Sequence, residues 1–151
     1  MRIGDGTRGA LHLALRPAFA VCLFLSQFTA ARDSFFSANP YALGFGMALI
    51  AAAVWLWLSA SRHLREAQRR DGVAQTGPFR YIRHPIYVSI YVLSLGLGLV
   101  FFAWVWFLVL AAFAPLWYLE CRCEEAEVLD RYGEAFAAYR QQTKMFIPCV
   151  V

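Results

Sequence analysis

Charge is scarce in this 151-residue sequence. Asp, Glu, Lys and Arg together make up 16% of it, compared with about 25% in a typical soluble domain, whereas hydrophobic residues make up 60%. No charged residue occurs between Pro85 and Leu119. This composition excludes an ordinary soluble protein and predicts one integral membrane domain over residues 1–151, in contact with the lipid bilayer. The thirteen Phe, seven Tyr and five Trp suit such a protein, because aromatic rings collect at membrane interfaces.

A continuous basic surface is also missing. The formal net charge is +4, but residues 62–84 hold six arginines against Glu66 and Asp71, whereas residues 120–151 hold four basic groups against six acidic ones. Because a nucleic-acid-binding protein needs an extended basic face, nucleic acid is not expected as a partner. The local excess of arginine in residues 62–84 is instead typical of a cytoplasmic loop between membrane spans.

Cysteine is sparse as well, with four residues in the chain. Cys121 and Cys123 lie two positions apart on a predicted helix, so their side chains diverge by about 200° and make poor joint metal ligands. Cys22 falls in a predicted span and Cys149 lies near the end of the sequence. Reduced thiols are therefore expected, and no metal site is predicted.

The apolar stretches predict an all-α, multi-pass membrane helical bundle with about four transmembrane helices and both termini in the cytoplasm. The first span is placed at Pro17–Ala31, although this stretch is short and a cleaved signal peptide is the alternative. The second span is Tyr41–Ser61, which ends at Arg62. Residues 85–119 are too long for one span and somewhat short for two. Two spans with a turn near residues 102–104 are favoured, because they return Arg122, Arg131, Arg140 and Lys144 of the C-terminal segment to the cytoplasmic side.

Small residues and helix breakers add detail to these spans. A charged extension follows the second span and is expected to break at Asp71-Gly72. Pro115 is expected to kink the last span. Close helix packing is expected at Gly44, Gly46 and Ala48 to Ala53, and close approach of a helix or a ligand is expected at Gly96 and Gly98. The last two could resemble a nucleotide-binding loop, but they lack the preceding strand that such a loop needs.

The segment Gly77-Pro78-Phe79-Arg80-Tyr81-Ile82-Arg83-His84-Pro85-Ile86-Tyr87 leads directly into the charge-free stretch. Its two prolines should push Gly77 and His84 toward extended conformations and start a helix at Pro85. Basic side chains at the start of a span are costly unless they bind something, so the segment is a candidate site for an anionic or carboxylate-bearing ligand. In the alternative interpretation, the arginines only anchor the span on its cytoplasmic side.

The C-terminal segment supplies the acidic counterpart. Leu129, Tyr132, Phe136 and Tyr139 recur at spacings of three, four and three, which predicts a cytoplasmic amphipathic helix lying along the membrane face. Glu124 and Glu125 are expected to start this helix, with Glu125 pointing toward the bundle. These carboxylates could hold a cationic or hydroxyl-rich ligand, or they could only complete ion pairs.

Three motifs in this order resemble those of the isoprenylcysteine carboxyl methyltransferase and phospholipid methyltransferase family: residues 77–87, 124–139 and Phe146-Ile147-Pro148. The likeness covers residues 77–148. It implies a small membrane enzyme that binds S-adenosylmethionine from the cytoplasm and methylates a lipidic or hydrophobic substrate. By match to the motifs, the cofactor site would consist of Arg83, His84, Pro85, Tyr87, Glu124 and Glu125. The sequence departs from the family at Ser89, where glycine is usual, and at Met145-Phe146, where a basic residue is usual.

The resemblance also suggests roles within the predicted site. Arg83 and His84 would contact the carboxylate of the cofactor or an anionic group of the substrate, Glu124 or Glu125 would bind the amino group or the ribose hydroxyls, and Tyr87 would pack on the cofactor. Arg83, His84 and Glu125 are the predicted catalytic residues. Carboxyl O-methylation is the favoured reaction, because Arg80, Arg83 and Lys144 near the expected mouth of the site favour an anionic acceptor.

Three alternatives remain open at this point. Methylation of a phospholipid amine fits the same motifs. Membrane sterol reductases carry a similar Arg-His-Pro motif and would use NADPH, but this sequence has no spare basic cluster for a 2′-phosphate. A non-catalytic membrane scaffold would explain the spans but not the order of the motifs.

Overall fold

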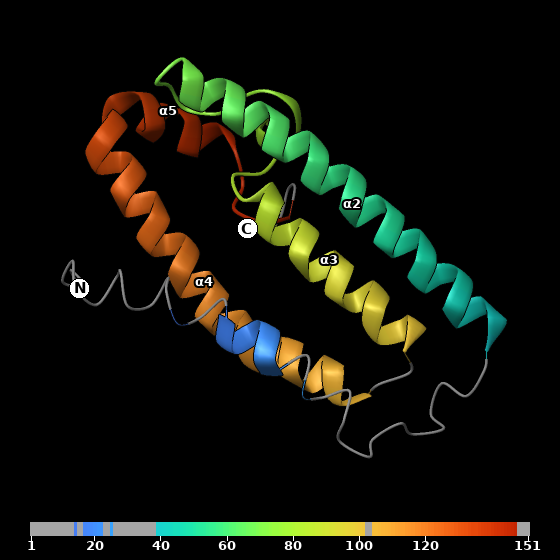
Figure 1. Cartoon of the computed structure of the whole chain (residues 1–151). Coiled ribbons are helices and arrows are strands. Elements are labelled where there is room, and N and C mark those ends of the chain that lie inside the picture. Colours follow the sequence, from blue (N-terminus) through green and yellow to red (C-terminus); the bar gives the residue numbers. More distant parts are fainter. Residues whose placement is uncertain (1–13, 15–16, 23–24, 26–38, 102–103, 148–151) are drawn as a thin grey trace. The chain divides into compact units, whose positions relative to one another are not determined.

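A computed structural model describes residues 14, 17–22, 25, 39–101 and 104–147 (Figure 1). Residues 17–22 are helical, and four longer helices and one short 3-10 helix follow. Their bounds are α2 (Pro40–Arg69), η2 (Gly77–Arg80), α3 (Pro85–Val100), α4 (Trp104–Tyr132) and α5 (Glu134–Gln142). Within these residues the one β-type pairing is an isolated parallel bridge between Ile82 and Lys144. The predicted all-α class is therefore confirmed.

Within the described residues, two helices are long and apolar enough to cross a membrane, Pro40–Arg69 and Val105–Tyr132. Only 11% of the most apolar window of the first and 28% of that of the second is buried inside the protein. A core helix of a soluble protein would be mostly buried, so these helices present their apolar side chains outward, as expected in lipid. Pro85–Val100 is apolar but shorter. Most of the predicted first span, residues 17–31, lies outside the described residues.

The end of α2 agrees with the sequence prediction. The amide of Gly72 donates to the carbonyl of Ala67 at 3.0 Å, and the amide of Asp71 donates to that of Gln68 at 3.2 Å. Asp71 has a φ of 47°. These bonds form a Schellman-type helix end, in which a left-handed residue closes the last turn. The charged extension thus remains helical up to Arg69 and breaks at Asp71-Gly72 as predicted.

Two compact units can be distinguished, and the first contains residues up to Ala48 together with Ser94–Glu124. A Cβ atom on Gly46 would lie 2.9 Å from the carbonyl oxygen of Gly96, and one on Gly98 would lie 3.0 Å from Cδ1 of Trp106. The predicted close packing is therefore confirmed at these glycines. It is wrong for Gly44, where an added Cβ would meet nothing within 4 Å.

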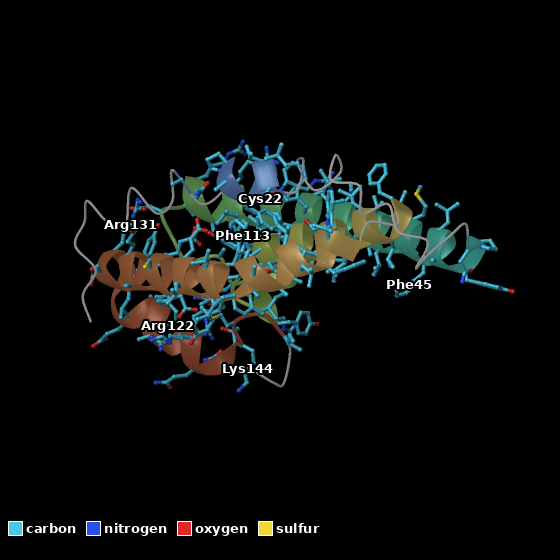
Figure 2. All side chains as sticks on the ribbon, turned by 90° about the horizontal axis from the view of Figure 1, so that it is seen from below. Cys22, Phe45, Phe113, Arg122, Arg131 and Lys144 are labelled. Atoms are coloured by element: carbon cyan, nitrogen blue, oxygen red, sulfur yellow. The ribbon has the colours of Figure 1, made fainter. Side chains whose placement is uncertain are left out.

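Residues 85–119 fall in two helices, since α3 ends at Val100 and α4 begins at Trp104, whereas their prediction as two membrane spans stays a prediction. Pro115 lies inside α4 without ending it. In the first unit, the buried ring of Phe19 packs against Phe113 of α4, which is labelled in Figure 2, with ring centroids 5.0 Å apart. The helical residues 17–22 thus pack on α4 within this unit.

The second unit contains residues 49–93 and 125–151. The prediction that Glu124 and Glu125 start a helix is wrong, because both lie inside α4, which continues to Tyr132. No glycine or proline interrupts the chain between Pro115 and Gly133, so nothing in the sequence ends the helix earlier. Gly133, with a φ of 53°, then divides the predicted amphipathic stripe between α4 and α5. Phe136 and Tyr139 are the buried residues of α5.

Candidate functional site

The basic motif begins with an unexpected backbone turn. Gly77 has a φ of 61°, so the prediction that it is extended is wrong. A Cβ at this position would lie 2.2 Å from Cδ2 of His63, which means that only glycine lets the chain pass this imidazole. His63 also lies 3.0 Å from Thr76, between Nδ1 and Oγ1. α2 therefore fixes where the motif starts, and α3 begins at Pro85 as predicted.

The backbone of the motif is held by the segment that follows α5. The amide of Arg83 donates to the carbonyl of Lys144 at 2.8 Å, and the amide of His84 donates to that of Met145 at 3.2 Å. The amide of Lys144 in turn donates to the carbonyl of Tyr81 at 3.5 Å. This pairing places Arg83 and His84 at one fixed point of the second unit. No pattern in the sequence indicates this pairing.

Tyr139 attaches α5 to the 3-10 helix of the motif. Its hydroxyl donates to the carbonyl of Phe79 at 2.7 Å. Burial is the main cause that raises the pKa of Tyr139 to about 12, and the charge of Glu125 acts in the same direction, whereas a hydrogen bond with Thr143 and the charge of Arg83 oppose them. The phenol is therefore a neutral donor at physiological pH.

The Arg83 side chain joins three parts of the second unit. Its Nε donates to Oε1 of Glu125 on α4 at 2.6 Å. Its Nη1 donates to the carbonyl of Arg140 on α5 at 3.2 Å and to the carbonyl of Thr143, just beyond that helix. Because these acceptors belong to the protein itself, Arg83 acts first as a positioning residue: it orients a carboxylate and closes the last turn of α5.

Glu125 is the centre of the cluster, with a side chain that is 4% exposed. Oε1 accepts from Arg83 and lies 3.3 Å from Nε2 of His84. Oε2 is buried and has no hydrogen-bond partner in the described part of the chain. The guanidinium of Arg140 forms an ion pair with it, with Nε 3.7 Å away and a side chain that is 43% exposed. One carboxylate oxygen is thus fully used and the other is not.

Aromatic rings border His84. Tyr87 is buried and meets the imidazole edge-on, with ring centroids 5.6 Å apart. Phe146 lies on the C-terminal segment with its centroid 5.8 Å from that of His84. Pro85 is fully buried at the start of α3. The hydroxyl of Ser89 donates to the carbonyl of Ile86 at 2.6 Å, so the residue that replaces the usual glycine is satisfied within its own helix.

The structure thus brings Arg83, His84, Tyr87 and Glu125 together, with Pro85 next to them in the chain. Glu124 is half-buried and precedes Glu125 on α4, where successive side chains point about 100° apart, so it leaves the helix in another direction. Sequence reasoning treated Arg140 only as a topological charge. No pattern in the sequence would have identified it, because its nearness to Glu125 depends on the break at Gly133.

The chemical character of this cluster is that of a polar binding centre. Among the described residues, no group of three or more His, Cys, Asp or Glu side chains is placed to hold a metal ion. The centre instead offers an unused carboxylate oxygen, a half-exposed guanidinium and an aromatic border. Such groups can bind a ligand that carries both charges.

Comparison with known proteins provides one match. A family model described as phospholipid methyltransferase matches residues 41–135, which is more than half of the chain. The matched range extends from the first residues of α2 to the start of α5 and includes Arg83, His84 and Glu125. No curated protein and no solved structure matches the chain.

Proposed function

The chain belongs to the phospholipid methyltransferase family, and on this premise we propose that it is an S-adenosylmethionine-dependent methyltransferase that acts on a lipidic substrate in the membrane. Family membership supports methyl transfer in a membrane in general. The identities of the cofactor, the methyl acceptor and the site residues are proposed below.

The observation that carries this proposal is the unused oxygen of Glu125. A buried carboxylate oxygen without a hydrogen bond is costly, so its retention within the motif calls for a ligand that donates to it. S-adenosylmethionine carries such donors in its ammonium group and its ribose hydroxyls. Tyr87 and Phe146 would border an adenosine-bearing ligand. The residues present therefore fit the cofactor, and Glu125, Arg83, His84 and Tyr87 would hold it.

When bound, the cofactor supplies a methyl group that its positively charged sulfur already activates. The protein then has to hold the acceptor in line with this methyl group and keep water away. Arg83 and His84 contribute by fixing the orientation of Glu125. In this proposal Arg83 acts through Glu125, which replaces the direct contact between Arg83 and the cofactor expected from the sequence.

We further propose that the acceptor is a carboxylate. Two guanidinium groups, those of Arg83 and Arg140, face the single carboxylate of Glu125, and the exposed Lys144 follows on the adjoining segment. This excess of positive charge favours an anionic acceptor over an ammonium. In the reaction, an oxygen–carbon bond forms and a sulfur–carbon bond breaks, with no proton transferred. The second candidate is a phospholipid amine, which His84 and Glu125 could help to deprotonate.

The proposed topology follows the arginine distribution. Residues 62–84 face the cytoplasm, four spans cross the cytoplasmic membrane, and the C-terminal helix α5 lies on the cytoplasmic side with the active site. The six arginines of residues 62–84 support this orientation.

The decisive experiment incubates the purified protein with methyl-labelled S-adenosylmethionine and a total membrane lipid extract, and then identifies the labelled product. We expect a labelled lipidic methyl ester with the wild type and little label with Glu125→Gln. Absence of labelled lipid with the folded wild type would refute the proposal, and binding of NADPH in place of the cofactor would favour a reductase.

A further inference from the structure

The guanidinium of Arg140 has unused hydrogen-bonding capacity beside a buried charge. Its Nε lies 3.7 Å from Oε2 of Glu125, which is an ion pair but too long for a hydrogen bond. The side chain donates no hydrogen bond to any residue in the described ranges, and 43% of it is exposed. An arginine fork of this kind can bind a carboxylate or a phosphate with two parallel hydrogen bonds.

Glu125, the partner of Arg140 in this ion pair, presents the opposite case. Its Oε2 is buried and accepts no hydrogen bond in the described part of the chain, while Oε1 is occupied by Arg83 and His84. A free donor group and a free acceptor group of opposite charge thus lie next to each other without satisfying each other. Each group therefore has hydrogen-bonding capacity that the described part of the chain does not use.

We propose that Arg140 and Glu125 together recognise a zwitterionic end group, in which an ammonium lies a few bonds from a carboxylate or a phosphate. The ammonium donates to Oε2 of Glu125, and the anionic group accepts from the Arg140 fork. This inference rests on the proposed methyltransferase function. It makes Arg140, which the sequence left without a role, a binding residue.

Arg83 is less suited to this task, although it is also an arginine in the cluster. Its Nε and Nη1 are already bound to Glu125 and to the carbonyls of Arg140 and Thr143. Those same bonds place both members of the proposed pair, since Arg83 holds the carboxylate of Glu125 and the backbone of Arg140. Arg83 therefore positions the receptor, and Arg140 contacts the ligand.

Two ligands in a membrane methyltransferase carry this chemistry. One is the methionyl end of the cofactor, with its ammonium and carboxylate. The other is the headgroup of an ethanolamine phospholipid, with its ammonium and phosphate. Experiments can distinguish the two ligands, because only the methionyl end belongs to the cofactor.

The first arm of the test compares the binding of S-adenosylhomocysteine and 5′-methylthioadenosine, which share adenosine and a thioether but differ in the amino-acid end group. We expect the wild type to prefer S-adenosylhomocysteine and Arg140→Gln to lose this preference by about 10- to 100-fold, the range for a hydrogen bond to a charged group. Arg140→Lys should lose less, because it keeps the charge but not the fork. The control is Arg122→Gln, which removes an exposed arginine that has no ion pair among the described residues.

The second arm uses phosphatidylethanolamine vesicles, with this lipid as the methyl acceptor, and measures the KM for it with the wild type and with Arg140→Gln. If the headgroup is the ligand, Arg140→Gln raises the KM for phosphatidylethanolamine and leaves the nucleoside preference intact. The inference is overturned if Arg140→Gln, folded as judged by its thermal unfolding, changes neither measurement while the wild type is active. An inactive wild type that binds neither nucleoside would instead refute the proposed function, and with it the inference.

Discussion

Arg83 and Glu125 lie 42 positions apart in the sequence and share a hydrogen bond of 2.6 Å. Their side chains are only 12% and 4% exposed. The bond links the residue before His84 to α4, and it leaves one oxygen of the carboxylate for a ligand. Because both charges are largely withdrawn from water, removing one of them leaves the other with a desolvation cost that its partner no longer offsets.

The first prediction concerns this pair. Glu125→Gln keeps the shape of the side chain but removes its charge, so we expect S-adenosylmethionine binding to weaken by about 1.5–3 kcal/mol. Arg83→Ala should weaken binding similarly and also lower stability, by about 3–5 kcal/mol, since it leaves the Glu125 charge buried without its partner. Titration calorimetry and thermal unfolding of both variants provide the measurements.

The double variant Arg83→Ala/Glu125→Gln serves as the control for this prediction. Its loss of unfolding free energy should be smaller than the sum of the losses of the two single variants, because no buried charge remains unpaired. Strictly additive losses of stability would contradict the pairing.

The second prediction concerns Gly77 and His63. Gly77→Ala should destabilise the protein through the positive φ, at about 1–2 kcal/mol, and further through the contact with His63. Gly133→Ala is a matched control, because its φ is 53° but an added Cβ meets nothing within 4 Å. Adding His63→Ala to Gly77→Ala should bring its loss close to that of Gly133→Ala. Thermal unfolding checks this, and equal losses for the two single glycine variants would show that the contact is unimportant.

The third prediction concerns the phenol of Tyr139. Tyr139→Phe should cost about 1 kcal/mol at pH 7, because the carbonyl of Phe79 loses its donor. Burial is the main reason that the folded-state pKa is about 12, above the ordinary value of about 10. The stabilisation is therefore complete below pH 10 and is lost as the pH rises from 10 to 12.

The measurement for Tyr139 is thermal unfolding of the wild type and Tyr139→Phe over that pH range. The difference in stability between the wild type and Tyr139→Phe should shrink above pH 10. Because lysines that titrate in the same pH range are present in both proteins, this difference reports on the phenol alone. A difference that stays constant to pH 12 would show that ionisation of Tyr139 does not affect folding.

Local signals in the sequence explain why much of the fold could be predicted. The proline at position 85 and the Asp71-Gly72 pair each act on a few neighbouring residues, and the helix start and helix end that they predicted were confirmed. The two spans predicted from the length of the charge-free stretch stay a prediction. Gly133 is the exception. The apolar spacing continues across it without interruption, although α4 ends just before this residue. A single glycine is tolerated inside many helices, so the spacing alone could not reveal the break.

The candidate site was predictable only in part, for a different physical reason. Residues of the recognised motifs, such as His84 and Glu125, could be identified individually, but the backbone partners of Arg83 could not. They include the carbonyls of Arg140 and Thr143, which lie 57 and 60 positions away and carry no side-chain signature. Backbone acceptors are the same in every residue, so only the folded chain shows which of them an arginine reaches.

The fourth prediction concerns the proposed four-span topology. In intact cells, a membrane-impermeant thiol reagent should fail to label Cys149 from outside and should label it after the cytoplasmic face is opened. Phe101→Cys is the matched opposite, because this exposed residue lies between α3 and α4, at the end expected outside. It should be labelled without opening the cells. Labelling of Cys149 from outside would refute the topology and the cytoplasmic site.

The last prediction concerns the methyl acceptor and depends on protonation. A carboxylate with an ordinary pKa near 4 is already ionised at pH 7, so it needs no base. A phospholipid amine is mostly protonated at that pH and must first lose a proton. With saturating cofactor, methylation of a carboxylate should therefore proceed at a nearly constant rate between about pH 6 and 8. The product should be an ester that alkali hydrolyses.

Glu125→Gln provides a second readout for the same question. If Glu125 only holds the cofactor, the residual rate of this variant at saturating cofactor should remain independent of pH. If the acceptor is an amine and Glu125 or His84 removes its proton, the wild-type rate should climb about tenfold per pH unit, and the product should resist alkali. A base-stable product with such a slope would show that the positive charge of Arg83 and Arg140 does not select an anionic acceptor, and it would establish N-methylation in its place.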